Sequence, residues 1–173
     1  MSKKYEQAYS YYDTSVYTSN VAIGGKNGSE FNYGAKKDQY ADYDATVRSL
    51  KAWYDGDTMR GLKVELTDDS SAMYGTAKGK ETETFKLKPG EKVSSLKVWG
   101  GDYDGGSCGG FKMTTTKKRS FDVPAPRKGD AYEYDVGSGI LVGVYGKSGS
   151  DVDCLGFNLL RSDRSSLYSG NYA

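Results

Sequence analysis

The chain has 173 residues, a length that suits one domain of ordinary size. Its 24 Lys and Arg residues nearly balance 23 Asp and Glu residues, so it has no general attraction to nucleic acid or to an anionic membrane. It contains no histidine, which excludes Ser-His-Asp catalysis, Cys-His catalysis and every zinc site that uses an imidazole.

The N-terminal segment, residues 1–19, is rich in tyrosine. Tyr5, Tyr9 and Tyr12 would share one face of a helix, whereas Tyr9 and Tyr11 would share one face of a strand, and the sequence does not decide between them. We expect an arm that packs on the domain or stays loose, rather than a binding segment. The segment has no apolar run of signal-peptide length, which predicts a cytoplasmic protein or one secreted without a visible signal peptide.

Apolar and polar residues alternate in several windows of the following chain, including residues 62–67, 85–88, 111–113 and 155–159. Such alternation places one face of a strand in a core and the other in water, as antiparallel sheets do. Glycine- and aspartate-rich turns separate the windows, and no internal window has helical spacing. The sequence therefore predicts an all-β fold.

The sequence matches three known catalytic or ligand-binding motifs in part, but each match lacks a required residue. A phosphate-binding loop ending at Ser148 would need glycine at Leu141, and a nucleophile elbow around Ser148 would need glycine at Ser150 and a base. A calcium loop starting at Asp102 would end at Met113 instead of glutamate. These failures predict no metal site and no cofactor.

Two carboxylate pairs, Asp151 with Asp153 and Asp102 with Asp104, have the residue types of a glycosidase. Charged turn residues often stand two apart by accident, so we expect a protein that is not an enzyme. The two cysteines, Cys108 and Cys154, are far apart in sequence; two buried free thiols are favoured over one disulfide.

Residues 141–157 carry the most informative pattern: an apolar strand, a tight glycine turn and a second apolar strand. Asp153 follows four residues after Gly149. This arrangement resembles the closing hairpin of the jacalin-related lectins, whose sugar-binding loop has the pattern Gly-x-x-x-Asp. The short pattern alone is unspecific, but here it stands between two strands within a longer match, Gly-Lys-Ser-Gly-x-x-x-Asp-x-x-Gly-Phe.

Other segments are similar to the same family in the same order along the chain. They correspond to its N-terminal glycine-rich loop, its first long hairpin, a strand–turn–strand unit with Pro-Gly-Glu, and a later hairpin: residues 24–31, 47–66, 85–96 and 111–121. The resemblance covers residues 20–160 and implies a β-prism of three four-stranded antiparallel sheets with pseudo-threefold symmetry. Residues 1–19, the tyrosine-rich arm, and residues 161–173, a polar C-terminal tail that we expect to be peripheral, fall outside it.

The resemblance also implies a carbohydrate site. In it, Gly149 fills the fixed glycine position, and Asp153 accepts hydrogen bonds from two neighbouring hydroxyls of mannose or glucose. The backbone N–H groups of Gly28, Ser150 and Asp151 would donate to the hydroxyl oxygens. The alternative is that Asp153 only caps its own turn.

The chain departs from the family pattern in places. A second Gly-x-x-x-Asp loop, present in some mannose-binding relatives, would span residues 56–60, but Arg60 stands in place of the aspartate and cannot accept a hydroxyl proton. Asn27 replaces a glycine of the N-terminal loop. Where the family has its specificity loop, Tyr103 could stack on a sugar ring, and Asp102 or Asp104 could accept further hydroxyls.

These features predict a lectin that recognises mannose- or glucose-containing glycans, because the galactose-preferring relatives are cleaved within the glycine loop and this chain continues through it. We expect a homodimer or higher oligomer, since single sugar sites are weak, and neither nucleic-acid binding nor membrane insertion. The alternative is a glycan-targeting domain of a pore-forming or defence protein, with oligomerisation or membrane association as its main role.

Overall fold

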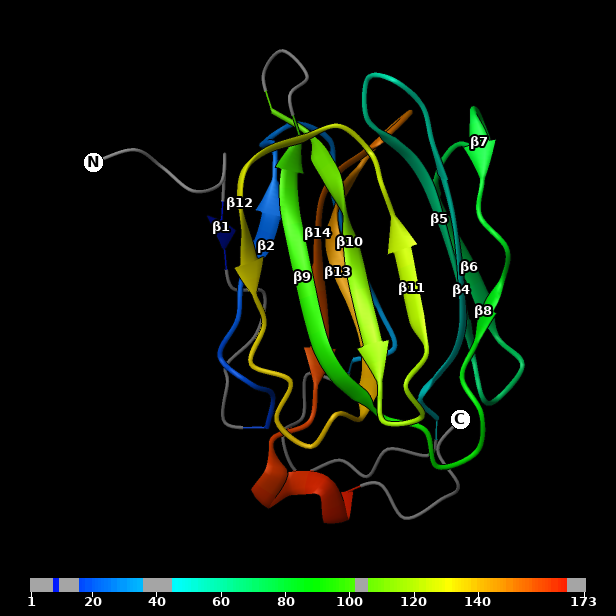
Figure 1. The fold of residues 1–173 in the computed structure, drawn as a ribbon, viewed down its shortest axis with the longest axis vertical. Helices are drawn as coiled ribbons and strands as arrows, with labels where there is room; N and C mark the ends of the chain where they lie inside the picture. Colours follow the sequence, from blue (N-terminus) through cyan, green and yellow to red (C-terminus); the bar gives the residue numbers. More distant parts are fainter. Residues whose placement is uncertain (1–7, 10–15, 36–44, 102–105, 168–173) are drawn as a thin grey trace.

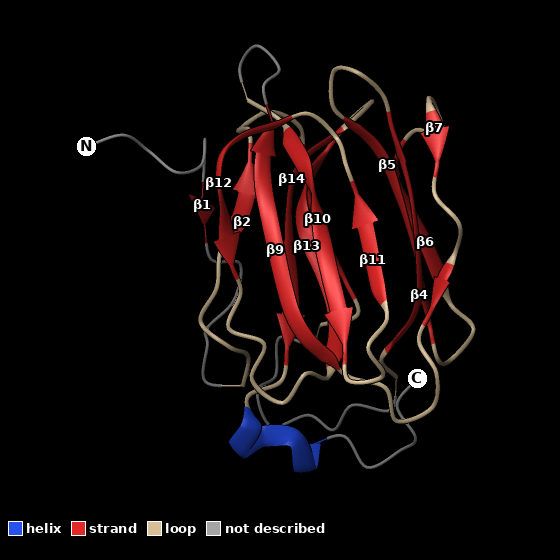
Figure 2. Cartoon of the chain, viewed as in Figure 1, coloured by secondary structure: helices blue, strands red, loops and turns tan. Residues whose placement is uncertain are grey.

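The computed structural model describes residues 8–9, 16–35, 45–101 and 106–167. In this part of the chain, three antiparallel sheets surround one hydrophobic core, which confirms the predicted all-β prism (Figures 1 and 2). The short 3-10 helix η1 (Ser162–Leu167) lies at one end of the prism, below the sheets in Figure 2. No helix in the described residues is long and apolar enough to cross a membrane.

The three sheets are called the first, second and third sheet. The first contains, from edge to edge, β1 (Ala8–Tyr9), β2 (Ala22–Gly24), β14 (Val152–Leu159), β13 (Leu141–Ser148) and β3 (Ser29–Tyr33). The second contains β11 (Ser120–Val123), β10 (Cys108–Thr115), β9 (Val93–Gly101) and β12 (Arg127–Glu133). The third contains β6 (Ser71–Gly75), β5 (Met59–Leu66), β4 (Val47–Tyr54) and β7 (Lys80–Glu81), and β8 (Phe85–Lys86) also pairs with β4.

The predicted pattern of three four-stranded sheets underlies this arrangement. β7 pairs with one part of β4 and β8 with another, so together they form a single interrupted edge of the third sheet. The first sheet gains its fifth strand from β1, which lies in the segment predicted to be an arm and pairs with β2. In the same segment, Val16 and Tyr17 are buried against Leu160 and its neighbours. The other residues of the segment that the structure describes, 18–19, continue the chain toward β2.

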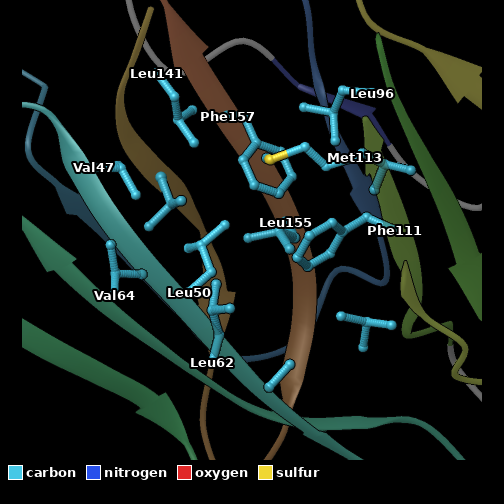
Figure 3. Packing of buried hydrophobic residues seen from close by; sticks show 14 of the residues in the cluster. Val47, Leu50, Leu62, Val64, Leu96, Phe111, Met113, Leu141, Leu155 and Phe157 are labelled. Atoms are coloured by element: carbon cyan, nitrogen blue, oxygen red, sulfur yellow. The ribbon is translucent and has the colours of Figure 1, made fainter. Parts of the chain in front are cut away.

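The windows that begin at Leu62 and Phe111 lie in strands whose apolar side faces inward and whose polar side does not. Residues 155–159 also lie in a strand, β14, but both of its faces are buried, so the expected water-facing side is absent there; residues 85–88 form a strand only over β8. In β5, Leu62 and Val64 are fully buried while Lys63 between them is exposed. Figure 3 shows side chains from the three sheets meeting in the core, with Phe111 of β10 and Phe157 of β14 close together. Their rings make an edge-to-face contact with centroids 5.0 Å apart, a favoured aromatic geometry.

Both cysteines are buried, and no disulfide joins them, as favoured from the sequence. Burial raises the pKa of the Cys108 thiol to about 12 because the thiolate would lose its hydration. The Sγ atom lies 3.7 Å from the sulfur of Met59 in the core. Cys108 therefore behaves as a small apolar side chain.

Candidate functional site

The candidate site forms where two loops of the first sheet meet. The glycine-rich loop, residues 25–28, connects β2 to β3, and the closing turn, residues 149–151, connects β13 to β14. Because β14 pairs with β2 and β13 pairs with β3, the two connections are brought together at the same end of the sheet. This is the upper end of the prism in Figure 1, where the β4–β5 loop also lies. Residues separated by more than 120 positions thus become neighbours.

Gly28 lies directly against the carboxylate of Asp153. A Cβ atom at position 28 would stand 2.5 Å from the Oδ2 atom of Asp153 and 2.9 Å from the backbone nitrogen of Ser148. Gly28 also has a φ of +90°, in a region that residues with a side chain rarely adopt. Both requirements are met only by glycine, so the sequence allows the loop to approach the carboxylate.

The Asp153 carboxylate is a partly buried acceptor with no partner in the described residues. The backbone of Asp153 is anchored, since its C=O accepts a hydrogen bond of 2.7 Å from the N–H of Gly25. Its side chain forms no hydrogen bond or ion pair with another described residue, so within that part of the chain it does not cap the turn. Burial, and secondly the negative charge of Asp151, raises the pKa of this carboxyl above its ordinary value. An acceptor held in this way is chemically suited to hydroxyl donors.

The closing turn leaves its outer amides available. Its internal hydrogen bond runs from the N–H of Gly149 to the C=O of Asp151 over 3.0 Å, and this bond does not use the N–H groups of Ser150 and Asp151. A Cβ atom at Gly149 would meet nothing within 4 Å. The protein's own packing therefore does not require glycine there, and the space beside the turn is open to a ligand.

The side chain of Asp151 is already engaged. Its Oδ1 atom accepts a hydrogen bond of 2.7 Å from Nη1 of Arg60, whose Nε atom donates to Asp55 over 2.6 Å. These carboxylates raise the pKa of Arg60 above its ordinary value. The backbone amide of Asp151, which this ion pair does not use, remains as a candidate ligand contact. The substitution of Arg60 for an aspartate was visible in the sequence, but its contact with Asp151 was not.

The predicted specificity-loop residues Asp102, Tyr103 and Asp104 lie outside the described residues. The described residues that border them are close to the site. Gly101 donates its N–H to the C=O of Ser107 over 2.7 Å, and a Cβ at Gly25 would stand 2.3 Å from the C=O of Gly106. The described residues on either side of 102–105 therefore lie next to the glycine-rich loop.

Two hollows in the described structure lie away from the candidate site. One, of about 700 Å³, is formed by β9 and β12 around Trp99 and Tyr132; the other, of about 380 Å³, lies near Phe85 and Phe121. Neither contains a residue of the candidate site. No group of three or more acidic, cysteine or histidine side chains in the described residues is arranged to hold a metal ion.

Three sheets surround one core, and at one end they bring together glycine-rich loops and a carboxylate with no partner among the described residues; together these features define a β-prism of the lectin type. The chain belongs to the jacalin-like lectin family, because the family model of the jacalin-like lectin domain matches residues 21–158. This confirms the resemblance drawn from the sequence. Membership places the chain among carbohydrate-binding domains and not among enzymes.

Solved structures agree with this assignment. The crystal structure of a lamprey immune protein is 32% identical to the chain, with a TM-score of 0.71, and the match covers 81% of this chain and 43% of that one. This chain thus spans less than half of the lamprey protein. Malaysian banana lectin is 25% identical with a TM-score of 0.65, covering 81% of this chain and 95% of that one. A mannose-specific jacalin-related lectin from Morus nigra, solved with mannose, is 20% identical to the chain with a TM-score of 0.64. The match covers 80% of this chain and 91% of that one, and it shows that the two share a fold. No curated protein sequence matches the chain.

Proposed function

We propose that the chain is a lectin that binds mannose- or glucose-containing glycans in the shallow site between the glycine-rich loop and the closing turn. Asp153 accepts hydrogen bonds from two neighbouring hydroxyls of one pyranose ring. The N–H groups of Gly28, Ser150 and Asp151 donate to the oxygens of the same hydroxyls. Each hydroxyl is then both donor and acceptor, which uses its full hydrogen-bonding capacity.

The observation that carries this proposal is the carboxylate of Asp153, which lies against Gly28 and has no partner in the part of the chain that the structure describes. A partly buried carboxylate without a partner among the described residues is unfavourable for folding, so its presence at the start of β14, directly after the closing turn, is best explained by a ligand. Mannose is favoured over galactose for two reasons. The chain continues through the glycine-rich loop, and the Morus nigra lectin of the same fold is mannose-specific.

The decisive experiment compares the wild-type protein with Asp153→Asn, which preserves the size of the side chain and removes its charge. A glycan array identifies the preferred ligands, and titration calorimetry with methyl mannoside and methyl galactoside measures affinity. Loss of two charge-assisted hydrogen bonds, about 1.5 kcal/mol each, predicts a roughly 100-fold weaker affinity for the mannoside. Asp130→Asn, a change at a carboxylate of β12 away from the site, is the matched control and should bind like wild type. A folded Asp153→Asn protein with wild-type affinity would exclude the proposed site.

Single sugar sites are weak, so useful avidity needs several sites in one assembly. We therefore include a homodimer or higher oligomer in the proposal. Light scattering coupled to size-exclusion chromatography measures the assembly directly, and a monomer at all concentrations would remove this part of it.

A second candidate function is supported by the lamprey immune protein, the most identical of the three structures compared, of which this chain matches only 43%. In this alternative the domain directs a larger defence protein to glycans on a target surface. Leakage of dye from glycolipid-containing liposomes distinguishes the two candidates. A lectin without further activity binds the liposomes and leaves them sealed, whereas a pore-forming assembly releases the dye.

A further inference from the structure

Arg60, at the start of β5, joins two loops that come from different sheets. Its guanidinium donates to Asp55 over 2.6 Å and to Asp151 over 2.7 Å, with a longer contact of 3.5 Å to Asp57. Only 20% of the Arg60 side chain and 18% of the Asp151 side chain are exposed. An ion pair that is mostly shielded from water, with short charge-assisted bonds, is stronger than a typical surface pair.

A second bond ties the closing turn to the third sheet beside this ion pair. The hydroxyl of Thr76 donates to the C=O of Ser150 over 3.0 Å. Thr76 is itself held next to Arg60, because its N–H donates to the C=O of Arg60 over 2.8 Å. Two successive residues of the turn, Ser150 and Asp151, are thus attached to one rigid strand pair, β5 and β6.

We propose that Arg60 is a positioning residue for the carbohydrate site: it holds the closing turn in its binding geometry and offsets the negative charge of Asp151 beside Asp153. This inference rests on the proposed lectin function. Arg60 makes no contact with the sugar itself. Its guanidinium is occupied by the carboxylates of Asp55, Asp57 and Asp151, so its effect on binding passes through Asp151.

The electrostatic part follows from the positions of the charges. Asp151 raises the pKa of the Asp153 carboxyl, and the guanidinium of Arg60 lies on Asp151 and offsets that effect. Without Arg60, the charge of Asp151 acts on Asp153 unopposed, and the pKa of Asp153 rises further. Further charged groups on the described elements around the site include Lys26 in the glycine-rich loop, Glu30 on β3 and Lys147 on β13, whose Nζ lies 3.5 Å from the C=O of Lys26. Because none of these groups is mutated in the variants used for the test, their effect on Asp153 is the same in each variant.

The test uses Arg60→Met and Arg60→Lys in the full chain, with affinity for methyl mannoside measured as a function of pH. Arg60→Met should weaken binding about tenfold at pH 7 and move the acid midpoint of binding to higher pH. Arg60→Lys should restore the midpoint but only part of the affinity, because an ammonium group cannot span Asp55 and Asp151 as the planar guanidinium does. Arg48→Met, which removes an ion pair of 2.6 Å with Asp69 at the other end of the third sheet, is the matched control and should change neither quantity.

A double variant separates the two effects. Arg60→Met combined with Asp151→Asn removes both charges, so the acid midpoint should return to the wild-type value or lower while affinity at pH 7 remains reduced. A merely structural role of Arg60 would lower stability and leave the midpoint unchanged. An Arg60→Met protein with wild-type affinity and midpoint would overturn the inference.

The inference can fail separately from the proposed function. Absence of sugar binding by the wild-type protein would refute the lectin proposal alone. The carboxyl pKa of Asp153, followed by carbon NMR, and hydrogen exchange at the amides of Ser150 and Asp151 still test Arg60 in that case. An unchanged carboxyl pKa and unchanged exchange in Arg60→Met would refute its positioning role.

Discussion

The ion pair between Glu91 and Arg119 joins the turn before β9 to the hairpin between β10 and β11. Nε and Nη2 of Arg119 donate to the two carboxylate oxygens of Glu91 over 2.9 and 2.7 Å. The hydroxyl of Thr115 and the N–H of Lys88 also donate to this carboxylate. The Glu91 side chain is fully buried, yet its hydrogen bonds, those from Arg119 foremost, lower its pKa from 4.5 to about 2.

This shift can be converted into stability. A pKa lowered by folding means that the ionised carboxylate stabilises the native state above the pKa of the unfolded chain. That contribution is lost as the pH falls from 4.5 toward 2. At about 1.4 kcal/mol for each unit, the shift corresponds to roughly 3 kcal/mol at pH 7. The value is similar to the roughly 3–5 kcal/mol measured when one partner of a buried ion pair is removed.

Glu91→Gln tests this reasoning by removing the charge while nearly preserving the shape. Urea unfolding followed by tryptophan fluorescence should show a free energy of unfolding about 3 kcal/mol lower than wild type at pH 7. The difference should shrink steadily between pH 4.5 and pH 2, because wild-type Glu91 itself becomes protonated. Glu133→Gln, at a largely exposed carboxylate paired with Lys97 over 3.6 Å, should change stability by less than about 0.5 kcal/mol. A difference between Glu91→Gln and wild type that stays constant from pH 7 to pH 2.5 would refute the argument.

Three further outcomes are expected. Gly28→Ala should abolish sugar binding and lower the free energy of unfolding by about 1–2 kcal/mol, measured by calorimetry and urea unfolding, because alanine disfavours the φ of +90° and its Cβ would press on the Asp153 carboxylate. Wild-type sugar affinity should fall on acidification as the Asp153 carboxyl becomes protonated, with a midpoint above the ordinary Asp pKa of 3.8. Asp153→Asn should be slightly more stable than wild type at pH 7, because the raised pKa of Asp153 means that its ionised form is unfavourable for folding. Cys108, with its pKa raised to about 12, should react with a thiol reagent only in urea, and rapid labelling of the native protein would contradict its burial.

The strands were predictable because burial on one face leaves a period of two in the sequence. The windows around Leu62 and Met113 show this pattern, with an exposed lysine between buried neighbours in each. Around Phe157 the alternation of residue types also predicted a strand, although both faces of β14 are buried. The break in the outer edge of the third sheet was not predictable. β7 and β8 are two residues each, and both depend on pairing with β4. The alternation at residues 85–88 predicts a strand where β8 forms, but it does not show that β7 and β8 divide one edge of the sheet.

The candidate site also contains residues that could be predicted from the sequence and a contact that could not. Gly149 and Asp153 could be named in advance because the motif fixes their spacing, and Gly28 because residues 24–31 resemble the glycine-rich loop of the family. Pairing of β2 with β14 and of β3 with β13 brings Gly28 and Asp153 together. The partner of Asp151 could not be named, because Arg60 is 91 positions away and on another sheet. The sequence showed that Arg60 cannot serve as a sugar acceptor; only the packing of the sheets shows what it contacts instead.

Met59 and Arg60 are neighbours in β5, but one belongs to the core and the other to the loops at the upper end of the prism. Met59 is fully buried in the core, whereas Arg60, the next residue of β5, points to the carboxylates of the neighbouring loops. Strand alternation therefore separates the residue that holds the prism together from the one that shapes its upper end. Aspartate at position 60 would restore the short motif but would stand among Asp55, Asp57 and Asp151 with no cation to balance them. A second sugar site would thus require changes at several of these carboxylates together. The charges around Arg60 instead favour one sugar site, at Asp153, whose closing turn Arg60 holds in place.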